Sequence, residues 1–219
     1  MVKVIELGAS NTIINNYIAE LRDVKVQGDR MRFRKNLERI GELAAYEISK
    51  TLEYKKVCVR TPLGEKDMNI LVDQPVLATI MRAGLPLHQG FLNVFDKADN
   101  AFIAAYRKYD KNEDFEIRIE YYSAANIDGR VLMLVDPMLA TGSSLVQCLE
   151  GLLHEEMMPK KLHLVAVIAS AEGVDYVKKK LRKYDATLWV GNIDDELTAK
   201  AYIVPGLGDA GDLAYGEKE

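Results

Sequence analysis

The chain has 219 residues, a hydrophobic fraction of 48%, a formal net charge of −4 and a pI of about 5.6. This length favours a single domain with a sizeable core. The acidic balance argues against a broadly basic, nucleic-acid-binding surface, so an anionic ligand would need local arginines, backbone donors or a metal ion. No stretch approaches the roughly 18 apolar residues of a membrane span, and we expect no signal peptide.

The cysteines and histidines suggest neither a disulfide framework nor a metal site. Cys58 and Cys148 lie far apart in unlike contexts, which suits a reducing cytoplasm. The histidines show no metal-ligand spacing, and we expect each to be a surface or packed residue. They are His88, His154 and His163.

The first 75 residues predict two amphipathic helices and a hairpin. Ser10 or Asn11 is the expected cap of the first helix, and Asp29 caps the second. Alternation around a Pro-Gly turn predicts the hairpin. We expect these elements to flank the core or to build a subunit contact. They cover residues 10–22, 29–52 and 54–72.

From residue 76 onward, short apolar runs alternate with amphipathic stretches. This order predicts right-handed βαβ units, and therefore an α/β fold with a mostly parallel twisted sheet flanked by helices. The predicted strands are 76–81, 101–106, 131–135, 162–168 and 187–190, and the helices between them lie near 86–95, 145–152 and 169–181.

The most informative stretch begins with the apolar run Val131–Val135 and continues through Asp136 and Pro137. Pro137 has no N–H and cannot extend a strand ladder. The small-residue loop Ala140–Ser144 then leads into a helix, whose N-terminal donors favour an anion. This order predicts a phosphate cradle that is neither a Walker loop nor a dinucleotide fingerprint. An ordinary capped turn is the alternative.

Two further loops carry arginines at predicted strand ends. Arg82 follows the strand 76–81 and begins a turn with Gly84, where an arginine can hold phosphate through two hydrogen bonds. Arg107, followed by Lys108, lies on a predicted two-stranded arm that could close over a reacting centre. A salt bridge at the rim and solvated charges on a hairpin are the respective alternatives.

The segment 201–212 combines three glycines and a proline with Asp209 and Asp212. This composition predicts an irregular loop rather than a helix or strand. Its backbone N–H and C=O groups would suit a planar ligand, and would reject rings with the wrong donor pattern. A flexible C-terminal loop is the alternative.

These motifs carry a family resemblance. Asp136-Pro-Met-Leu-Ala-Thr-Gly142 resembles the motif that binds phosphoribosyl diphosphate (PRPP) in type I phosphoribosyltransferases, in the form used by the uracil branch. Tyr202–Asp212 resembles the uracil-binding segment of that branch, and Arg82-Ala-Gly84 its diphosphate loop. Most of the superfamily has two adjacent acids where this chain, like the uracil branch, has Asp136-Pro137. The chain departs from the family at two positions where glycine is commoner. These positions are Pro86 and Ser143.

The resemblance implies the type I phosphoribosyltransferase fold in one domain over residues 1–219. It divides the chain into flanking elements (1–75), a core with a projecting β-arm (76–200) and a base-binding segment (201–219). It also implies a pentosyltransferase of pyrimidine salvage that converts uracil and PRPP to UMP and diphosphate.

The same resemblance implies site residues. Mg²⁺ is expected through diphosphate oxygens and water, with Asp209 as the one candidate protein contact. The implied PRPP-binding residues are Arg82, Arg107, Asp136, Pro137, Met138, Leu139, Ala140, Thr141, Gly142, Ser143, Ser144 and Asp209. The implied uracil-binding residues are Ile203, Gly208, Asp209 and Ala210.

Family members are commonly dimeric or larger, and some respond to GTP. We therefore expect a cytoplasmic homo-oligomer, with GTP as a candidate effector and neither nucleic acid nor membrane as a partner. Two alternatives stay open. One is a nucleotide-sensing regulator of the same fold that binds RNA, which the acidic pI disfavours. The other is a purine or orotate transferase, which the segment 201–212 disfavours.

Overall fold

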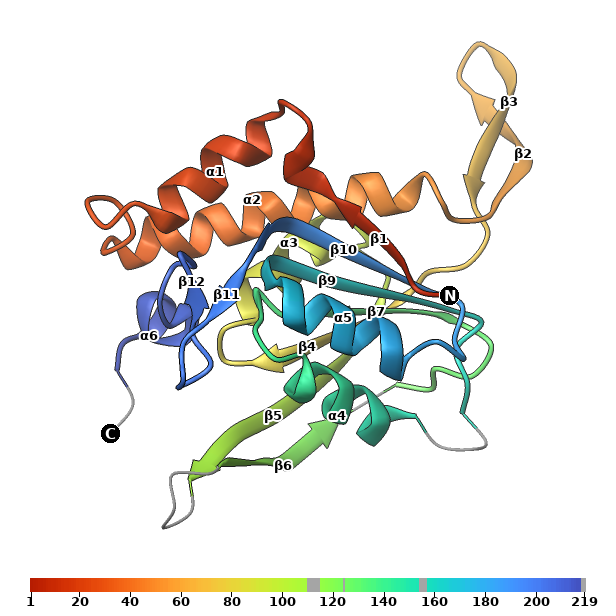
Figure 1. The fold of residues 1–219 in the computed structure, drawn as a ribbon. Helices are drawn as coiled ribbons and strands as arrows, with labels where there is room; N and C mark the ends of the chain where they lie inside the picture. Colours follow the sequence, from red (N-terminus) through yellow and green to blue (C-terminus); the bar gives the residue numbers. More distant parts are fainter. Residues whose placement is uncertain (110–114, 124, 154–156, 218–219) are drawn as a thin grey trace.

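The computed structural model describes residues 1–109, 115–123, 125–153 and 157–217, with the side chains of 105–122 left aside. A central sheet in the order β1-β10-β9-β7-β4-β5-β6 organises the molecule, and β8 pairs with β9 (Figure 1). All its pairs are parallel except β5–β6, which confirms the predicted α/β sheet. The strands are β1 (Lys3–Glu6), β4 (Val76–Met81), β5 (Asp99–Tyr109), β6 (Phe115–Ser123), β7 (Val131–Val135), β8 (Met138–Leu139), β9 (Lys161–Ser170) and β10 (Ala186–Asp194).

Helices cover both faces of this sheet, and each face has its own apolar core. Leu77 and Met133 pack with α1 (Ile13–Arg22), α2 (Arg30–Ser49) and α3 (Leu85–Val94). Ala78 and Leu134 point the other way, toward α4 (Ser143–Leu152) and α5 (Ala171–Lys180). Because these strands are buried on both faces, they appear in the sequence as apolar runs without a polar alternation.

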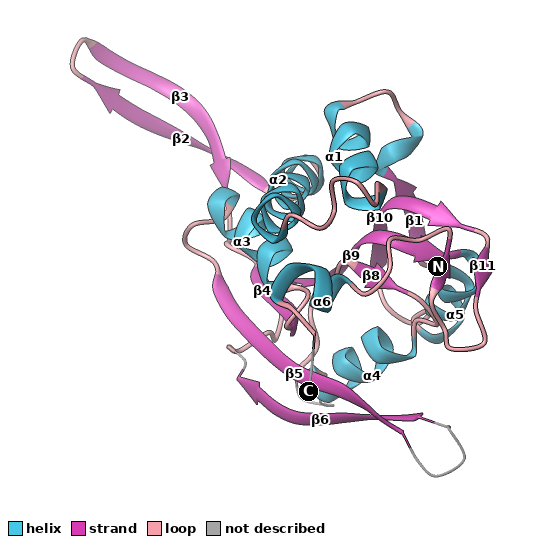
Figure 2. Cartoon of the chain, turned by 90° about the vertical axis from the view of Figure 1, so that its left-hand side faces the viewer, coloured by secondary structure: helices cyan, strands magenta, loops and turns pink. Residues whose placement is uncertain are grey.

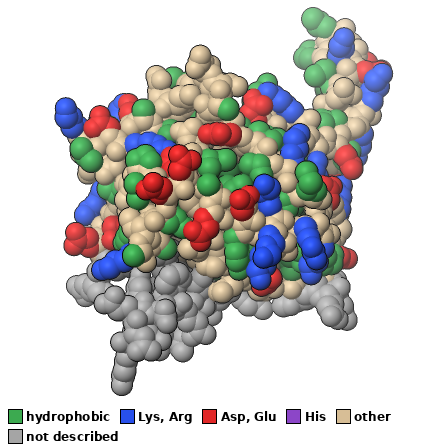
Figure 3. All heavy atoms as spheres, viewed as in Figure 1, with side chains coloured by type: hydrophobic (Ala, Val, Ile, Leu, Met, Phe, Trp, Pro, Cys, Tyr) green, Lys and Arg blue, Asp and Glu red, His purple; other side chains and the backbone are tan. Residues whose placement is uncertain are grey.

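The predicted hairpin is confirmed as β2 (Tyr54–Thr61) and β3 (Gly64–Leu71). It forms its own two-stranded sheet and projects from the body beyond α2 (Figures 1 and 2). Figure 3 shows hydrophobic side chains on its surface. A two-stranded hairpin alone is marginally stable in water.

Several elements differ from the prediction. Thr12, rather than Ser10 or Asn11, precedes α1, and its side chain makes no capping bond. The short strand β1 joins the edge of the sheet, so the first 75 residues do more than flank the core. The C-terminal segment is more regular than expected. It contains β12 (Ile203–Val204), which pairs with β11 (Glu196–Leu197), and the helix α6 (Ala210–Tyr215).

Pro137 interrupts the sheet in the predicted way, but the chain returns to it at once. Its carbonyl accepts hydrogen bonds from the backbone N–H groups of Val167 and Ile168 at 3.0 Å each. Met138 and Leu139 then pair with β9 as β8. Pro137 therefore stays attached through its C=O while the missing N–H ends β7.

The connections reverse direction between β4 and β7, which are neighbours in the sheet. The chain leaves β4 through α3 toward β5 on one side, and leaves β7 through α4 toward β9 on the other. A crevice opens outside the carboxyl ends of parallel strands at such a switch point, and ligands of open α/β sheets bind there. Figure 2 faces this end of the molecule, with α6 near its centre.

Among the described residues, the helices are all too short or too polar to cross a membrane.

Candidate active site

The switch point brings two predicted site residues to one edge of the sheet. Arg82 follows β4 and Asp136 follows β7. The Thr79 hydroxyl donates to the Val135 carbonyl at 3.3 Å and ties the two strand ends together. A Cβ at Gly84 would collide with the Thr79 hydroxyl and the Ile80 carbonyl, so only glycine lets the Arg82 loop turn this tightly.

The predicted phosphate cradle has the expected loop-to-helix geometry. Gly142 adopts φ 78°, a left-handed conformation that favours glycine, and α4 starts at Ser143. The hydroxyls of Thr141 and Ser143 lie 2.8 Å apart and share a hydrogen bond. Asp136 Oδ1 accepts from the backbone N–H of Met138 at 3.4 Å. The loop that follows Asp136 therefore combines two hydroxyls with the N-terminus of a helix.

Two residues that support this loop from behind, Ser170 and Gly173, were not predicted. The buried Ser170 hydroxyl donates to the Ala140 carbonyl at 2.6 Å and accepts from Gly173 N–H at 2.9 Å. A Cβ at Gly173 would collide with the Ala140 carbonyl, so α5 lies close against the loop. The sequence signalled only that Ser170 could cap a helix.

Cys148 on α4 is excluded as a nucleophile. Burial raises the pKa of its thiol to about 12, and the charge of Asp136 acts in the same direction. The thiol is therefore protonated at neutral pH and packs as a small apolar residue. Cys58 is exposed on the hairpin, away from the sheet.

Arg82 is bonded to the C-terminal helix. Its Nη2 donates to Asp212 Oδ1 at 2.7 Å and to the Gly216 carbonyl at 2.9 Å. This contact joins the predicted diphosphate loop to the predicted base-binding segment across 130 residues of sequence. No individual role for Asp212 was predicted from the sequence.

The base-binding segment is held by a polar network that was also not predicted. Arg22 donates to both carboxylate oxygens of Asp194 at 2.7 Å and to the Gly206 carbonyl at 2.9 Å. Gly206 N–H donates to the same carboxylate at 2.9 Å. Gln27 binds the Leu207 carbonyl at 3.1 Å. Arg22 at the end of α1, Gln27 just after it and Asp194 of β10 therefore hold this segment in place.

The predicted uracil-contacting residues lie in this fixed segment. The side chains of Ile203 and Ala210 are buried in the core, so only their backbone groups can face a ligand. Gly208 adopts φ 96° and is exposed. Asp209 caps α6 by accepting from the backbone N–H of Asp212 at 3.0 Å.

The remaining residues that the sequence singled out are an unusual proline, the basic residues of the arm and the histidines. Pro86 lies in the first turn of α3, where its missing N–H is not needed, so it belongs to the helix rather than to the loop. The backbone of Arg107 lies in β5, whereas its side chain and that of Lys108 lie outside the described part. His88 and His163 are buried, as expected of packed residues, and His154 lies outside the described residues.

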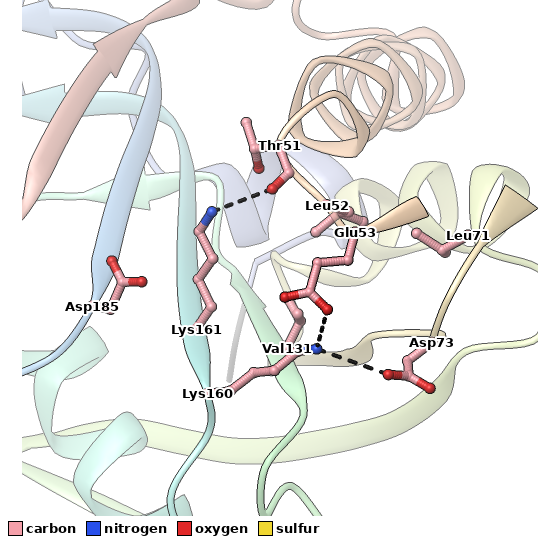
Figure 4. A pocket seen from close by; sticks show the side chains of 9 residues that line it. All are labelled: Thr51, Leu52, Glu53, Leu71, Asp73, Val131, Lys160, Lys161 and Asp185. Carbon is pink, nitrogen blue, oxygen red and sulfur yellow. Dashed lines mark hydrogen bonds and ion pairs between the residues drawn. The ribbon is translucent and has the colours of Figure 1, made fainter. Parts of the chain in front are cut away.

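The described residues contain no cluster of three or more histidine, cysteine or acidic side chains that could hold a metal ion. A pocket of about 270 Å³ opens elsewhere, at the amino ends of β7 and β9 (Figure 4). Three acids there, Glu53, Asp73 and Asp185, outnumber the two lysines, and Lys160 already pairs with Glu53 at 3.2 Å. This pocket lies at the end of the sheet opposite the predicted motifs.

Comparison with known proteins agrees with the geometry. A family model for uracil phosphoribosyltransferase matches residues 9–217. The chain is 50% identical over 216 residues to a uracil phosphoribosyltransferase of Porphyromonas gingivalis, covering 99% of both chains. It is 39% identical over 207 residues to one of Pyrococcus furiosus, covering 93% of this chain and 86% of the relative. The solved structure of the AQ2163 protein from Aquifex aeolicus superposes with a TM-score of 0.85 at 32% identity, over 97% of this chain and 98% of that one.

The match spans nearly the whole chain, including all three predicted loops, and the expected type I phosphoribosyltransferase fold is confirmed. The chain belongs to the uracil phosphoribosyltransferase family.

Proposed function

We propose that this chain transfers the phosphoribosyl group of PRPP to N1 of uracil, forming UMP and diphosphate in pyrimidine salvage. The bond between C1′ and the diphosphate oxygen breaks, a C1′–N1 bond forms, and N1 loses its proton. The observation that carries the proposal is the direct contact between Arg82 and Asp212 at the switch point of a family-typical sheet. This contact joins the predicted diphosphate loop to the predicted base-binding segment.

The 5′-phosphate of PRPP would bind between Ala140 and Ser144. Backbone N–H groups at the start of α4 and the hydroxyls of Thr141 and Ser143 supply donors without a lysine. Asp136 would accept hydrogen bonds from the ribose hydroxyls, with Pro137, Met138 and Leu139 as the spacer that sets its distance from the loop. Ser170 and Gly173 support this loop from behind.

The diphosphate would face Arg82 and Arg107. Arginine suits this role because its charge is permanent and its planar fork matches phosphate oxygens. Arg107 lies on the β5–β6 arm, which could cover the reacting centre and exclude water.

Uracil would lie against the backbone of Ile203, Gly208 and Ala210, with Asp209 between the base and PRPP. The ring has two carbonyl acceptors and two N–H donors, which backbone groups complement. A base with another donor pattern would leave buried partners unpaired. The network of Arg22 and Asp194 keeps these backbone groups in fixed positions.

The donor set fits Mg²⁺ held mainly by substrate. Magnesium sites of this kind use one or two carboxylates with phosphate oxygens and water, and Asp209 at the start of α6 is the candidate protein contact. When bound, Mg²⁺ would neutralise charge on the departing diphosphate. Asp209 would orient water or metal while its Oδ1 caps α6.

The chemistry would rest on positioning and electrostatics rather than on a covalent intermediate. The bound C1′ and N1 atoms are held within reach of each other, and the arginines stabilise negative charge that grows on the leaving group. No side chain is assigned as a general base.

The proposal extends to assembly, regulation and location. One face of the hairpin carries Val57, Val59, Met68 and Ile70, with Val57 directly opposite Met68, and we propose that a second copy of the chain covers it. The chain would work as one domain, with flanking elements (1–75), a core (76–200) and a base-binding segment (201–219). GTP is the candidate effector, without an assigned site. The two free cysteines suit a cytoplasmic location.

The decisive experiment measures UMP formation from uracil, PRPP and Mg²⁺, with adenine, hypoxanthine and orotate in parallel. Of the four bases, we expect only uracil to react with PRPP. Turnover of a purine or of orotate, or PRPP binding without turnover of any base, would contradict the proposal. Arg82→Ala should weaken PRPP binding, and unchanged affinity would remove Arg82 from the diphosphate site.

A further inference from the structure

The contact between Asp212 and Arg82 supports the function proposed above, but Asp212 itself has no role assigned there. We propose that Asp212 is a positioning residue, which holds Arg82 ready for diphosphate and couples the binding of diphosphate to the binding of uracil. This inference rests on the proposed function and assigns a role to a further residue of the same site.

The contacts of Arg82 leave one nitrogen of its guanidinium, Nη1, for a ligand. A guanidinium has five N–H groups, and the two on Nη2 are used by Asp212 Oδ1 and the Gly216 carbonyl. Nε is buried without a partner, close to Gly211, where a Cβ would lie 3.8 Å from it. The two N–H groups of Nη1 are therefore the ones that can turn to an incoming anion.

A short chain of contacts leads from this guanidinium to the base. Asp212 accepts from Arg82, and its own backbone N–H donates to Asp209 Oδ1 at 3.0 Å. Asp209 adjoins Gly208 and Ala210, whose backbone we assign to uracil. A ligand that fixes Arg82 thereby fixes the start of α6, and a ligand that fixes α6 fixes Arg82. Such coupling is reciprocal by thermodynamic necessity.

Stability does not account for the Arg82–Asp212 pair. Their side chains remain 32% and 35% exposed, and ion pairs with this much solvent contact contribute little to folding. The helix also has an independent attachment, because Arg34 Nη1 donates to the Ala214 carbonyl at 2.7 Å. The fold should therefore survive the loss of the Asp212 carboxylate.

The test titrates uracil into the full-length protein by calorimetry, with and without saturating Mg²⁺-diphosphate. We expect diphosphate to tighten uracil binding by about tenfold in the unmodified protein, a typical size for coupling between sites. In Asp212→Ala this factor should fall to about one, and KM for PRPP should rise by about tenfold with a smaller change in kcat. Asp212→Asn should fall between the two, because its amide oxygen still accepts from Arg82 without a charge.

Arg34→Ala is the matched control, because it removes another hydrogen bond between α6 and the body and leaves Arg82 untouched. It should keep the tenfold factor. Equal loss of coupling in Arg34→Ala would show that general docking of α6 matters, and would overturn the inference. Coupling that persists in Asp212→Ala, or is absent from the unmodified protein, would also overturn it. The proposed function is judged separately, by whether the unmodified protein forms UMP.

Discussion

A single hydroxyl, that of Ser170, holds the predicted phosphate loop against the body of the molecule. It caps α5 through Gly173 N–H and donates to the Ala140 carbonyl, so one side chain satisfies backbone groups of two elements. Because Ser170 is fully buried, no water can replace it without a rearrangement.

We therefore predict that Ser170→Ala lowers the free energy of unfolding by about 1–3 kcal/mol, the cost of unpaired buried groups and a lost cap. KM for PRPP should rise severalfold, because the loop loses its support, while KM for uracil stays nearly constant. Urea unfolding and initial-rate kinetics measure both effects. Ser49→Ala is the control, since that exposed hydroxyl bonds only the Tyr46 carbonyl within α2. Equal effects of the two substitutions would contradict the assigned role.

The sequence indicated candidate site residues that lie at strand ends, and missed candidates that act through distant partners. Arg82 and Asp136 follow apolar runs, so their position was readable from local pattern. Asp212 could not be assigned, because its partner Arg82 is 130 residues away. Ser170 is likewise 30 residues from Ala140. Local pattern contains no information about which side chains meet across a fold.

At the scale of elements, the buried strands of five or more residues could be predicted, and the strands of two to four residues could not. The strand Val131–Val135 agrees with its predicted bounds, because a short continuous apolar run between turn signals is typical of a strand buried on both faces. β1, β8, β11 and β12 have two to four residues each, too few for a periodic signal. The helix α6 was hidden by its glycine-rich start, although Asp209 is an ordinary capping residue.

The predicted base-binding segment has little regular secondary structure, and the carboxylate of Asp194 holds it in place. Asp194 is 8% exposed, forms two hydrogen bonds with Arg22 and accepts from Gly206 N–H. Without it, Arg22 and the Gly206 N–H would both lose a partner in a mostly dry environment.

We predict that Asp194→Ala raises KM for uracil by at least about tenfold and leaves KM for PRPP nearly unchanged, since it loosens only the base-binding segment. The free energy of unfolding should drop by about 3 kcal/mol, as expected when one partner of a buried pair is removed. Separate titrations of the two substrates test this. Asp99→Ala, which breaks the exposed pair with Arg130, serves as the control and should leave both KM values intact. A rise in KM for PRPP alone would refute the prediction.

At the scale of the whole molecule, the sheet buries a histidine that resists protonation. His163 on β9 accepts a hydrogen bond from Trp189 Nε1 at 3.0 Å, and its Nε2 is buried without a partner. Burial, with a smaller contribution from Lys161, lowers the pKa of His163 to about 4 from 6.5. Between these two values the unfolded chain binds a proton that the folded chain does not. The stability that neutral, buried His163 contributes is therefore fully present above pH 6.5 and is lost as the pH drops toward 4.

This shift predicts that the free energy of unfolding falls by about 2 kcal/mol between pH 7.5 and pH 5 on account of His163. Urea unfolding at both values measures the total change. In His163→Gln, which keeps an acceptor for Trp189, the drop should shrink by that amount. Burial also lowers the pKa of His88, so part of the drop should remain. An identical pH dependence in both proteins would exclude His163 as its source.

The projecting hairpin gives a prediction about assembly. Met68 and Ile70 are 48% and 41% exposed, and cross-strand pairing sets them on one face with Val57 and Val59. If a second copy covers this face, Ile70→Glu should bury a charge in the contact and convert the oligomer to a monomer in sedimentation velocity. The matched control is Asn69→Glu, which adds the same charge on the opposite face of the same strand, across from Lys56. An Ile70→Glu protein that stays oligomeric, or an unmodified protein that is monomeric, would assign the hairpin another role.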